Sequence, residues 1–549
     1  MGRTSTLHKL AFVLCTVGYV GRALASGAEG PQTFTYVHHP VSTNNPAAQF
    51  AFDRGLTLAF AYSSQESDRA FREAARLDPS LAMAWWGIAL AAGPDINTEP
   101  TIKATAAAAE AIARARLLAA QRATPEEREY IEALATRYSS DPKPDFDRLA
   151  IAYREAMRAI VASHPDDADA RALYAEAIMD LRPWRLWAPD GTPAPDTLEL
   201  VSEIQQGLAR HPRHLGLLHY EIHALEASEH PERALDAARQ LGALPTEVAA
   251  AHLVHMPAHI YLRIGDWPAA IAANVHATHH ALEYRLSDNP KQELACGHCA
   301  DFLTYAYMMD GEEARARASA LVYEKLSKDP TNTLAVLERF HEWDDLLAAP
   351  EVPTDLKPYD RDVHAVRGFW HYGRGLAFVA RGRLDRAATE LNELKEEAAL
   401  APPEPVFGAK LDVEHSGDKL QQAGDAAALK VCLAILPARI AAARGDLAQA
   451  IAQLREAVSL QDHMVYSEPP NWAYPVRESL GALLLRQHAT QEAEAVFREG
   501  LKRTPNDPRM LLGLSAALHA QGRENEAAQA HTAFAEAWKG GSEPSATEL

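Results

Sequence analysis

The sequence is poor in basic residues, and it lacks several common catalytic motifs. Lys and Arg together number 54 against 74 Asp and Glu, which gives a net charge of -20. This deficit of positive charge disfavours binding to nucleic acid and to anionic lipid head groups. No P-loop, dinucleotide-binding glycine fingerprint, GxSxG or HExxH motif occurs. Small molecules, metal ions and proteins are therefore the expected partners.

Long apolar runs are missing except at the N-terminus. In residues 1–25, two basic residues precede an apolar stretch from Leu10 to about Gly21, and small residues follow at Ala23 and Ala25. This order is typical of a secretory signal peptide cleaved after Ala25; an uncleaved membrane anchor is the alternative. The stretch is short for a bilayer span. We expect a periplasmic or secreted protein with no membrane span after cleavage.

Cysteine is also rare, since the chain has 4. Cys15 lies in the predicted signal peptide, which leaves Cys296, Cys299 and Cys432 in a compartment where disulfides persist. The tetrapeptide CGHC at 296–299 matches the redox motif of disulfide isomerases, but no strand precedes it as such a site requires. We expect a local disulfide between Cys296 and Cys299, or inert thiols. Thiolate metal ligation and redox catalysis are the alternatives.

What the sequence does contain is a repeat with a period of 34 residues. Gly481, Ala493 and Phe497 take the eighth, twentieth and twenty-fourth positions of the tetratricopeptide repeat (TPR) pattern, and Ser515 and Ala527 follow the first two by 34 residues. Small residues at these positions let two antiparallel helices approach closely. The same spacing recurs elsewhere in the chain, at Gly55, Phe71, Ala74 and Pro79, at Gly375 and Ala387, and at Ala438 and Ala450.

The stretches between these units also favour helix, and no sustained two-residue alternation argues for a sheet. We therefore predict an all-α fold, a TPR-type superhelix of helical hairpins. Irregular, proline-rich stretches divide it, and residues 182–196 form a predicted inserted loop. The predicted parts are a signal peptide (1–25), an N-terminal arm (26–46), a front TPR block with a His-lined groove (47–348), a linker (349–362), a rear TPR block (363–539) and a disordered tail (540–549).

Repeat register indicates where the histidines of HLVHMPAHIYLRIGDW, residues 252–267, point. Ala270 follows Gly265 by five residues, as Ala387 follows Gly382, and so takes the twentieth position. His255 and His259 then fall at the fifth and ninth positions, which line the concave groove in TPR superhelices.

The preceding unit gives the same positions to His219 and His223, with Glu226 at the twelfth. The following unit places His298, Asp301 and Tyr305 at the second, fifth and ninth.

Imidazole and carboxylate groups are ligands for zinc, copper or iron, and two histidines four residues apart on a helix can chelate one ion. The predicted metal ligands are His219, His223, His255, His259, His298 and Asp301. We expect Glu226, Tyr305 and Arg263 in the groove beside them. A polar peptide groove lined by histidine and purely structural histidines are the alternatives. Four other histidines are expected off the groove face, namely His252, His276, His279 and His280.

The chain resembles TPR proteins over about residues 47–535. Within them it is similar to a group of largely uncharacterised exported bacterial TPR proteins, in which the stretches AMAWWGIAL, HYEIHALEAS, HLVHMPAHIYLRIGDW and EPPNWAYPVRESLGALLL are expected. The resemblance implies that the five candidate histidines belong to the pattern of the group. Cys299 stands where Asn is expected, and Asp301 stands where His is expected. The group supplies no reaction.

Two functions fit these observations. The first is an exported TPR protein that holds a protein or peptide partner in its groove and carries a transition-metal site built from inward-facing histidines. The second is a metal-dependent enzyme, an oxidoreductase or a hydrolase, that uses the same histidines.

Overall fold

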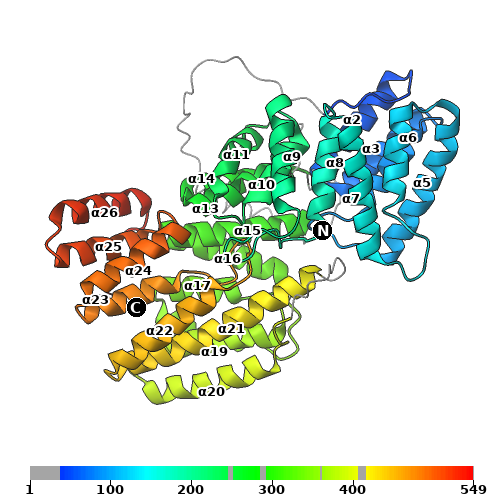
Figure 1. Cartoon of the computed structure of the whole chain (residues 1–549). Coiled ribbons are helices and arrows are strands. Elements are labelled where there is room, and N and C mark those ends of the chain that lie inside the picture. The colour runs from blue at the N-terminus through cyan, green and yellow to red at the C-terminus, as the bar shows by residue number, and fades with distance from the viewer. Residues whose placement is uncertain (1–36, 245–250, 285–291, 359–360, 406–415, 548–549) are drawn as a thin grey trace. The chain divides into compact units, whose positions relative to one another are not determined.

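The computed structural model describes residues 37–244, 251–284, 292–358, 361–405 and 416–547. This part of the chain consists of helices joined by turns, and its only β contacts are two isolated bridges, Asp95–Thr98 and Trp187–Pro193. Successive helices form antiparallel hairpins (Figure 1). The predicted all-α, TPR-type fold is confirmed.

The described residues form two compact units. The N-terminal unit holds residues 37–257 together with 416–419, and the C-terminal unit holds 258–405 and 420–547. The division predicted at 349–362 thus lies inside the C-terminal unit. The helices of the N-terminal unit are α2 (Pro46–Phe60), α3 (Ser64–Leu77), α4 (Ala82–Ala91), α5 (Ile102–Arg122), α6 (Pro125–Ala135), α7 (Phe146–Ser163), α8 (Ala168–Met179), α9 (Thr197–Arg210), α10 (Leu215–Leu225), the 3-10 turn η1 (Pro231–Ala234), α11 (Leu235–Gly242) and α12 (Ala251–His255).

The C-terminal unit continues the hairpin pattern. Its helices are α13 (Pro257–Ile264), α14 (Trp267–Tyr284), α15 (Gln292–Asp310), α16 (Glu313–Ser327), α17 (Thr331–Arg339), α18 (Trp343–Ala348), α19 (Val363–Ala380), α20 (Leu384–Leu400), α21 (Ser416–Ala443), α22 (Leu447–Asp462), α23 (Val476–Arg486), α24 (Thr490–Arg503), α25 (Pro508–Ala520) and α26 (Glu524–Ala537).

One packing motif recurs in both units and explains the repeat spacing. A Cβ at Gly481 or at Gly513 would lie 2.3 Å from Cζ of Phe497. In the N-terminal unit a Cβ at Gly55 would lie 2.7 Å, and one at Gly87 2.2 Å, from Cδ1 of Phe71. In each case a buried phenylalanine lies between two glycines that allow neighbouring helices to close on its ring.

The turn inside many of the described hairpins has a shared geometry. In these turns a residue one or two positions after the first helix adopts a left-handed backbone, and the next N–H bonds to a carbonyl five residues earlier, as in Asp266 N–H to Tyr261 O at 2.8 Å. Glycine fills the left-handed position in five of the described hairpins, at Gly265, Gly311, Gly382, Gly445 and Gly522. Three bulkier residues occupy it in others, at Tyr62, His341 and His488.

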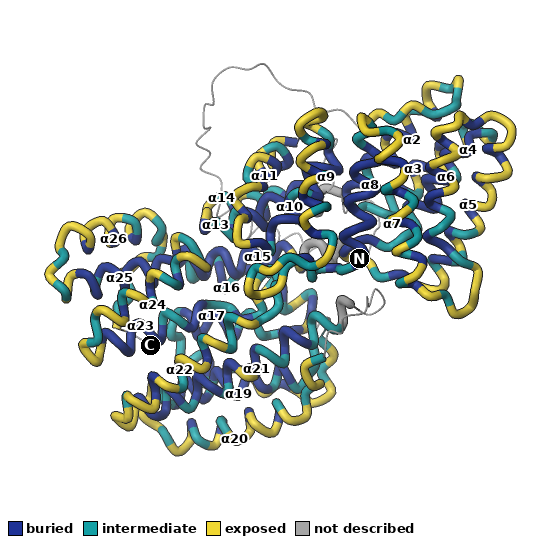
Figure 2. Tube along the Cα trace, viewed as in Figure 1, coloured by how far each residue is buried: buried dark blue, intermediate teal, exposed yellow. Residues whose placement is uncertain are grey.

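Helices α8 and α10 are buried along almost their whole length, which Figure 2 shows as dark blue tube. Both are apolar on most sides, as expected of a helix that packs against neighbours all round. The polar residues that they carry are therefore buried as well, among them Asp169 and Glu176 on α8 and His219 and His223 on α10. Buried groups of this kind require partners, and they mark the candidate site.

Helix α21 is the one helix of the described residues that is long and apolar enough to cross a membrane, over Lys419–Ala443 with a mean hydropathy of 1.8. Of its apolar window 61% is buried inside the protein. Cys432 and Leu436 lie in the apolar core with Leu454 of α22 and Leu480 of α23. A buried core helix meets the same criterion, so the absence of a membrane span stays a prediction.

The segments predicted to be irregular make defined contacts. In the 182–196 loop the indole N–H of Trp187 donates to the carbonyl of Ala224 at 2.8 Å. The tail for which disorder is predicted is described through Thr547, and the carbonyl of Ser542 in this tail accepts a hydrogen bond from the indole N–H of Trp538 at 3.0 Å. The predicted signal peptide, residues 1–25, lies outside the described residues.

Candidate metal site

Three imidazoles converge in the N-terminal unit. His219 and His223 lie one turn apart on α10, and both are buried. The Nε2 atoms of these two rings are 3.1 Å apart, and Nε2 of His252 on α12 lies 3.1 Å from Nε2 of His219. One ring nitrogen from each of the three lies within 4.8 Å of the others. Three nitrogen atoms at this spacing can ligate a single ion.

Hydrogen bonds on the far side of two rings fix their tautomers. Nδ1 of His219 lies 2.7 Å from the carbonyl oxygen of Phe60, which can only accept, so Nδ1 carries the proton. Nδ1 of His223 lies 2.9 Å from Oε1 of Glu226 and donates to that carboxylate. In the neutral rings both Nε2 atoms then carry lone pairs that face each other. Metal-ligating histidines are held from behind by carbonyl or carboxylate groups in the same manner.

Two aromatic side chains frame the imidazoles. The ring of Tyr62 contacts His219 edge-on with centroids 4.7 Å apart, and it lies 5.8 Å from His223 and 5.7 Å from His252. The indole of Trp184 contacts His223 edge-on at 5.5 Å. Tyr62 and Trp184 both have positive φ angles, of 53° and 59°. Bulky residues seldom adopt this conformation, and strain of this kind clusters at functional sites.

Buried acidic groups lie behind this frame. Burial raises the pKa of Asp95 to about 6 and that of Asp180 to about 7, although Arg137 opposes the shift of Asp180 through their ion pair. Burial, and then the charge of Asp180, raises the pKa of Glu176. Asp95 and Asp180 line a cavity of about 120 Å³ together with Trp184. Trp184 therefore forms part of the cavity wall and also contacts a member of the imidazole cluster.

The predicted pair His219 and His223 is thus brought together, with Glu226 holding His223. The expectation that His252 lies off the groove face is wrong, because its Nε2 joins the cluster. The register contained the signal: with His255 at the fifth position, His252 takes the second, which also faces the groove. His255 is buried in the same unit, and its ring centroid is 6.3 Å from that of His252.

The remaining candidates lie in the C-terminal unit. His259 is buried, and its Nδ1 lies 2.8 Å from Oε2 of Glu468, a partner that the sequence did not suggest. His298 is exposed, and its ring centroid is 6.3 Å from that of His259. Oδ1 of Asp301 accepts a hydrogen bond from Asn332 at 2.7 Å. A single centre that includes all six predicted ligands stays a prediction.

Arg263 and Tyr305, predicted to lie in the groove, line a cavity of about 190 Å³ in the C-terminal unit together with Glu468. The guanidinium of Arg263 lies over the ring of Tyr466 at 5.7 Å. Burial raises the pKa of Tyr305. Arg263 and Tyr305 therefore line a cavity, and Glu468, which also lines it, contacts His259.

The predicted disulfide stays a prediction. Cys299 is buried on α15, whereas the side chain of Cys296 lies outside the described residues.

Sequence reasoning missed Tyr62, Trp184 and the acidic groups. Tyr62 is separated from His219 by more than four repeats, so no local pattern joins them. One signal was available, because Tyr62 precedes Ser67 by five residues, the interval that separates Gly265 from Ala270. A tyrosine at a position that usually holds glycine is unusual and marks a residue kept for its side chain.

No protein family matches the chain, and no curated protein matches it. Among solved structures, the chain is similar to human IFIT1 as a dimer with PPP-AAAA, at 13% identity over 88% of this chain and 90% of that one, with a TM-score of 0.31. It is also similar to yeast Tom70, at 12% identity over 90% of this chain and 93% of that one, with a TM-score of 0.28. Likeness at this level does not imply a shared function.

Proposed function

We propose that this protein binds a transition-metal ion, zinc, copper or iron, through Nε2 of His219, His223 and His252. The observation that carries the proposal is the contact of two Nε2 atoms at 3.1 Å whose rings both donate through Nδ1. Two lone pairs at that distance repel each other unless a cation lies between them. Two imidazole nitrogens on one tetrahedral zinc ion would be about 3.4 Å apart, which is close to the observed spacing.

A proton between the ring nitrogens is the alternative cation, but it can bridge fewer of the Nε2–Nε2 contacts than a metal ion can. Nε2 of His219 faces Nε2 of both His223 and His252 at 3.1 Å. One proton on this atom can point toward only one neighbour, whereas a metal ion accepts all three lone pairs at once. The carboxylate of Glu226 supplies negative charge next to the ion, which favours a divalent cation.

Metal analysis of the untagged full chain tests the proposal. We expect about one equivalent of ion from this cluster in the wild type, and its loss in the His219→Ala, His223→Ala double variant. His230→Ala serves as the control, because His230 is an exposed histidine of the same unit that pairs with Glu232. A wild type without stoichiometric metal, or a double variant that keeps all of it, would contradict the proposal.

Export and partner binding complete the proposed function. The signal-like residues 1–25 support export to the periplasm or the medium. The consecutive helical hairpins of a TPR-type fold support a protein or peptide partner in a groove. Recovery of a protein with the full chain purified gently from its native compartment would support this part, and repeated purification without one would count against it.

A metal-dependent enzyme, a hydrolase or an oxidoreductase, is the second candidate. It is favoured by the cavity of about 120 Å³ whose wall residue Trp184 contacts His223. Asp180 lines this cavity with a pKa raised to about 7, so it can accept or release a proton near neutral pH. A catalytic site keeps an exchangeable position on its metal, whereas a structural site is closed.

Azide binding to the Co²⁺-substituted protein separates a catalytic site from a closed one. An exchangeable position predicts a change in the visible Co²⁺ spectrum when azide is added. A spectrum that azide leaves unchanged would contradict the enzyme, while the metal site itself would stand.

A further inference from the structure

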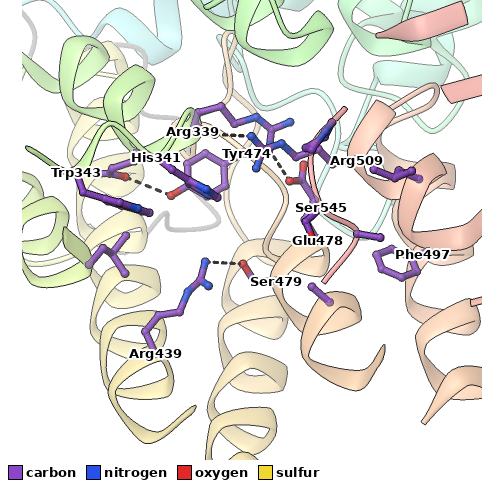
Figure 3. A pocket seen from close by; sticks show the side chains of 16 residues that line it. Arg339, His341, Trp343, Arg439, Tyr474, Glu478, Ser479, Phe497, Arg509 and Ser545 are labelled. Carbon is purple, nitrogen blue, oxygen red and sulfur yellow. Dashed lines mark hydrogen bonds and ion pairs between the residues drawn. The ribbon is translucent and has the colours of Figure 1, made fainter. Parts of the chain in front are cut away.

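A further pocket lies in the C-terminal unit, and none of the candidate metal ligands lines it. Its volume is about 40 Å³, and residues of α17, α21, α23, α25 and the C-terminal segment line it. Figure 3 shows Arg339, Arg439 and Arg509 around it, with Glu478 against Arg339 and Ser479 against Arg439. Three guanidinium groups in one small pocket are the starting point of the inference.

Arg439 is the decisive residue because no counter-ion for it lies among the residues that the structure describes. Its Nη2 donates to Oγ of Ser479 at 3.1 Å. Its Nε is buried and has no hydrogen-bond partner within the described part of the chain, where no carboxylate lies within 4.0 Å of its nitrogens either. A buried guanidinium that lacks a counter-ion is unfavourable. Burial accordingly lowers the pKa of Arg439.

The other groups of the pocket do not supply the missing negative charge. Burial raises the pKa of Glu338 to about 8, so this carboxyl is mostly neutral at pH 7, and its Oε2 accepts from the hydroxyl of Tyr474 at 3.2 Å. Glu478 is engaged by Nη1 of Arg339 at 2.5 Å. Nη2 of Arg509 donates to the backbone carbonyl of Arg339, also at 2.5 Å. Both carboxyl groups of the pocket therefore already contact other residues, Glu478 an arginine and Glu338 a tyrosine.

We infer that this pocket binds a small oxyanion, with Arg439 and Ser479 as its principal donors. The planar fork of a guanidinium presents parallel N–H groups that match the oxygen atoms of a carboxylate or a phosphate. The volume of about 40 Å³ has room for one such group. Ser545 of the C-terminal segment also lines the pocket (Figure 3). The inference concerns the C-terminal unit and does not depend on the proposed metal site.

Thermal unfolding of the full chain in EDTA, at constant ionic strength, tests the inference with inorganic phosphate, acetate and chloride as probes. We expect phosphate or acetate to raise the Tm saturably while chloride does not, and the better of the two identifies the group. In Arg439→Gln the apparent affinity should fall about tenfold or more, because a charged hydrogen bond contributes about 1.5–3 kcal/mol. Arg455→Gln is the control, since Arg455 forms an exposed ion pair with Glu492 on neighbouring helices.

A purely structural role for Arg439 would appear differently. Arg439→Gln would then lower the Tm by the same amount with and without the anion. Should that variant fail to fold, Ser479→Ala keeps the charge and removes one donor, and it should weaken the saturable shift several-fold. Absence of a saturable shift with both oxyanions in the wild type, or an equal shift in Arg439→Gln, overturns the inference.

Discussion

The ring of Tyr62 contacts the ring of His219 edge-on, with centroids 4.7 Å apart, from a backbone position that glycine fills in five other hairpins of the described residues. Ser63 N–H bonds to Leu58 O at 2.9 Å, so the turn has the same hydrogen bond as the glycine-containing turns. The hairpin thus keeps its geometry while a bulky residue takes a left-handed φ of 53°. The turn does not require tyrosine, so we attribute the tyrosine at this position to the contact that its ring makes with His219.

Replacement of Tyr62 by glycine and by alanine should separate backbone strain from the contact of the ring. Both variants lose the ring and should weaken metal binding alike. Tyr62→Gly should nevertheless be more stable than Tyr62→Ala by about 1 kcal/mol, because a left-handed conformation is unfavourable for any residue with a Cβ. Urea unfolding of the metal-free proteins measures the difference.

Gly445→Ala is the matched control for Tyr62. Gly445 has a φ of 87°, and no atom lies within 4 Å of the position that a Cβ would take, so only the backbone opposes the substitution. It should lower the free energy of unfolding by about 1 kcal/mol. Equal stability of Tyr62→Gly and Tyr62→Ala would show that the turn at Tyr62 is not strained.

Repeat spacing predicted the fold well because the packing that it encodes is local. Gly481 and Phe497 are sixteen residues apart and lie in one hairpin, so their contact follows from the spacing alone. The pair His219 and His223 was found for the same reason, since both lie on one helix. Tyr62, Trp184 and Asp180 reach the site from other helices and loops, and their positions depend on how hairpins stack. That stacking is absent from any single repeat, and so these residues were missed.

The glycines around Phe497 should tolerate no larger residue. A Cβ at Gly481 would lie 2.3 Å from Cζ of Phe497, which is flanked on its other side by Gly513. Gly481→Ala should therefore lower the free energy of unfolding by about 1–3 kcal/mol, the usual effect of overpacking. Gly541→Ala, at a position with nothing within 4 Å, should change it by much less. Chemical denaturation of the two variants compares them, and equal effects would contradict the packing described.

Asp169 should make stability depend on pH in a defined window. Hydrogen bonds from His214 and His39 lower the pKa of Asp169 against the effect of burial, and the bond to Asp169 raises the pKa of His39 despite its burial. A lowered carboxyl pKa stabilises the fold above about pH 4, where the unfolded chain loses its proton, and a raised imidazole pKa stabilises it below about pH 6.5. The contribution is therefore complete between these values, and it declines as the pH falls further or rises through the pKa of folded His39.

Asp169→Asn should remove this pH dependence and lower the free energy of unfolding by about 3 kcal/mol near pH 5.5, a value typical of a broken buried ion pair. Urea unfolding from roughly pH 3 to pH 8 provides the measurement, because this range includes the reference pKa values of both aspartate and histidine. Asp166→Asn is the control, because Asp166 is exposed and pairs with exposed Arg210. A wild type and an Asp169→Asn variant with parallel pH profiles would exclude the proposed role of the ion pair.

Glu226 should set the affinity of the metal site although it does not face the ion. Its Oε1 accepts the Nδ1 proton of His223 at 2.9 Å, and it is almost fully buried. Glu226→Gln keeps an acceptor of the same shape and removes the charge, so His223 becomes a weaker ligand. Metal affinity should fall about 10–100-fold, the usual effect of losing a group that orients a ligand.

The chain offers a matched pair for this test of Glu226. His230 and Glu232 form the same kind of contact at 3.1 Å, but both are exposed. Competition with a chromophoric chelator should therefore give unchanged affinity for Glu232→Gln and reduced affinity for Glu226→Gln. If the two variants bind metal equally well, Glu226 only fixes the packing of the His223 ring. That result would contradict the role of Glu226 in metal binding.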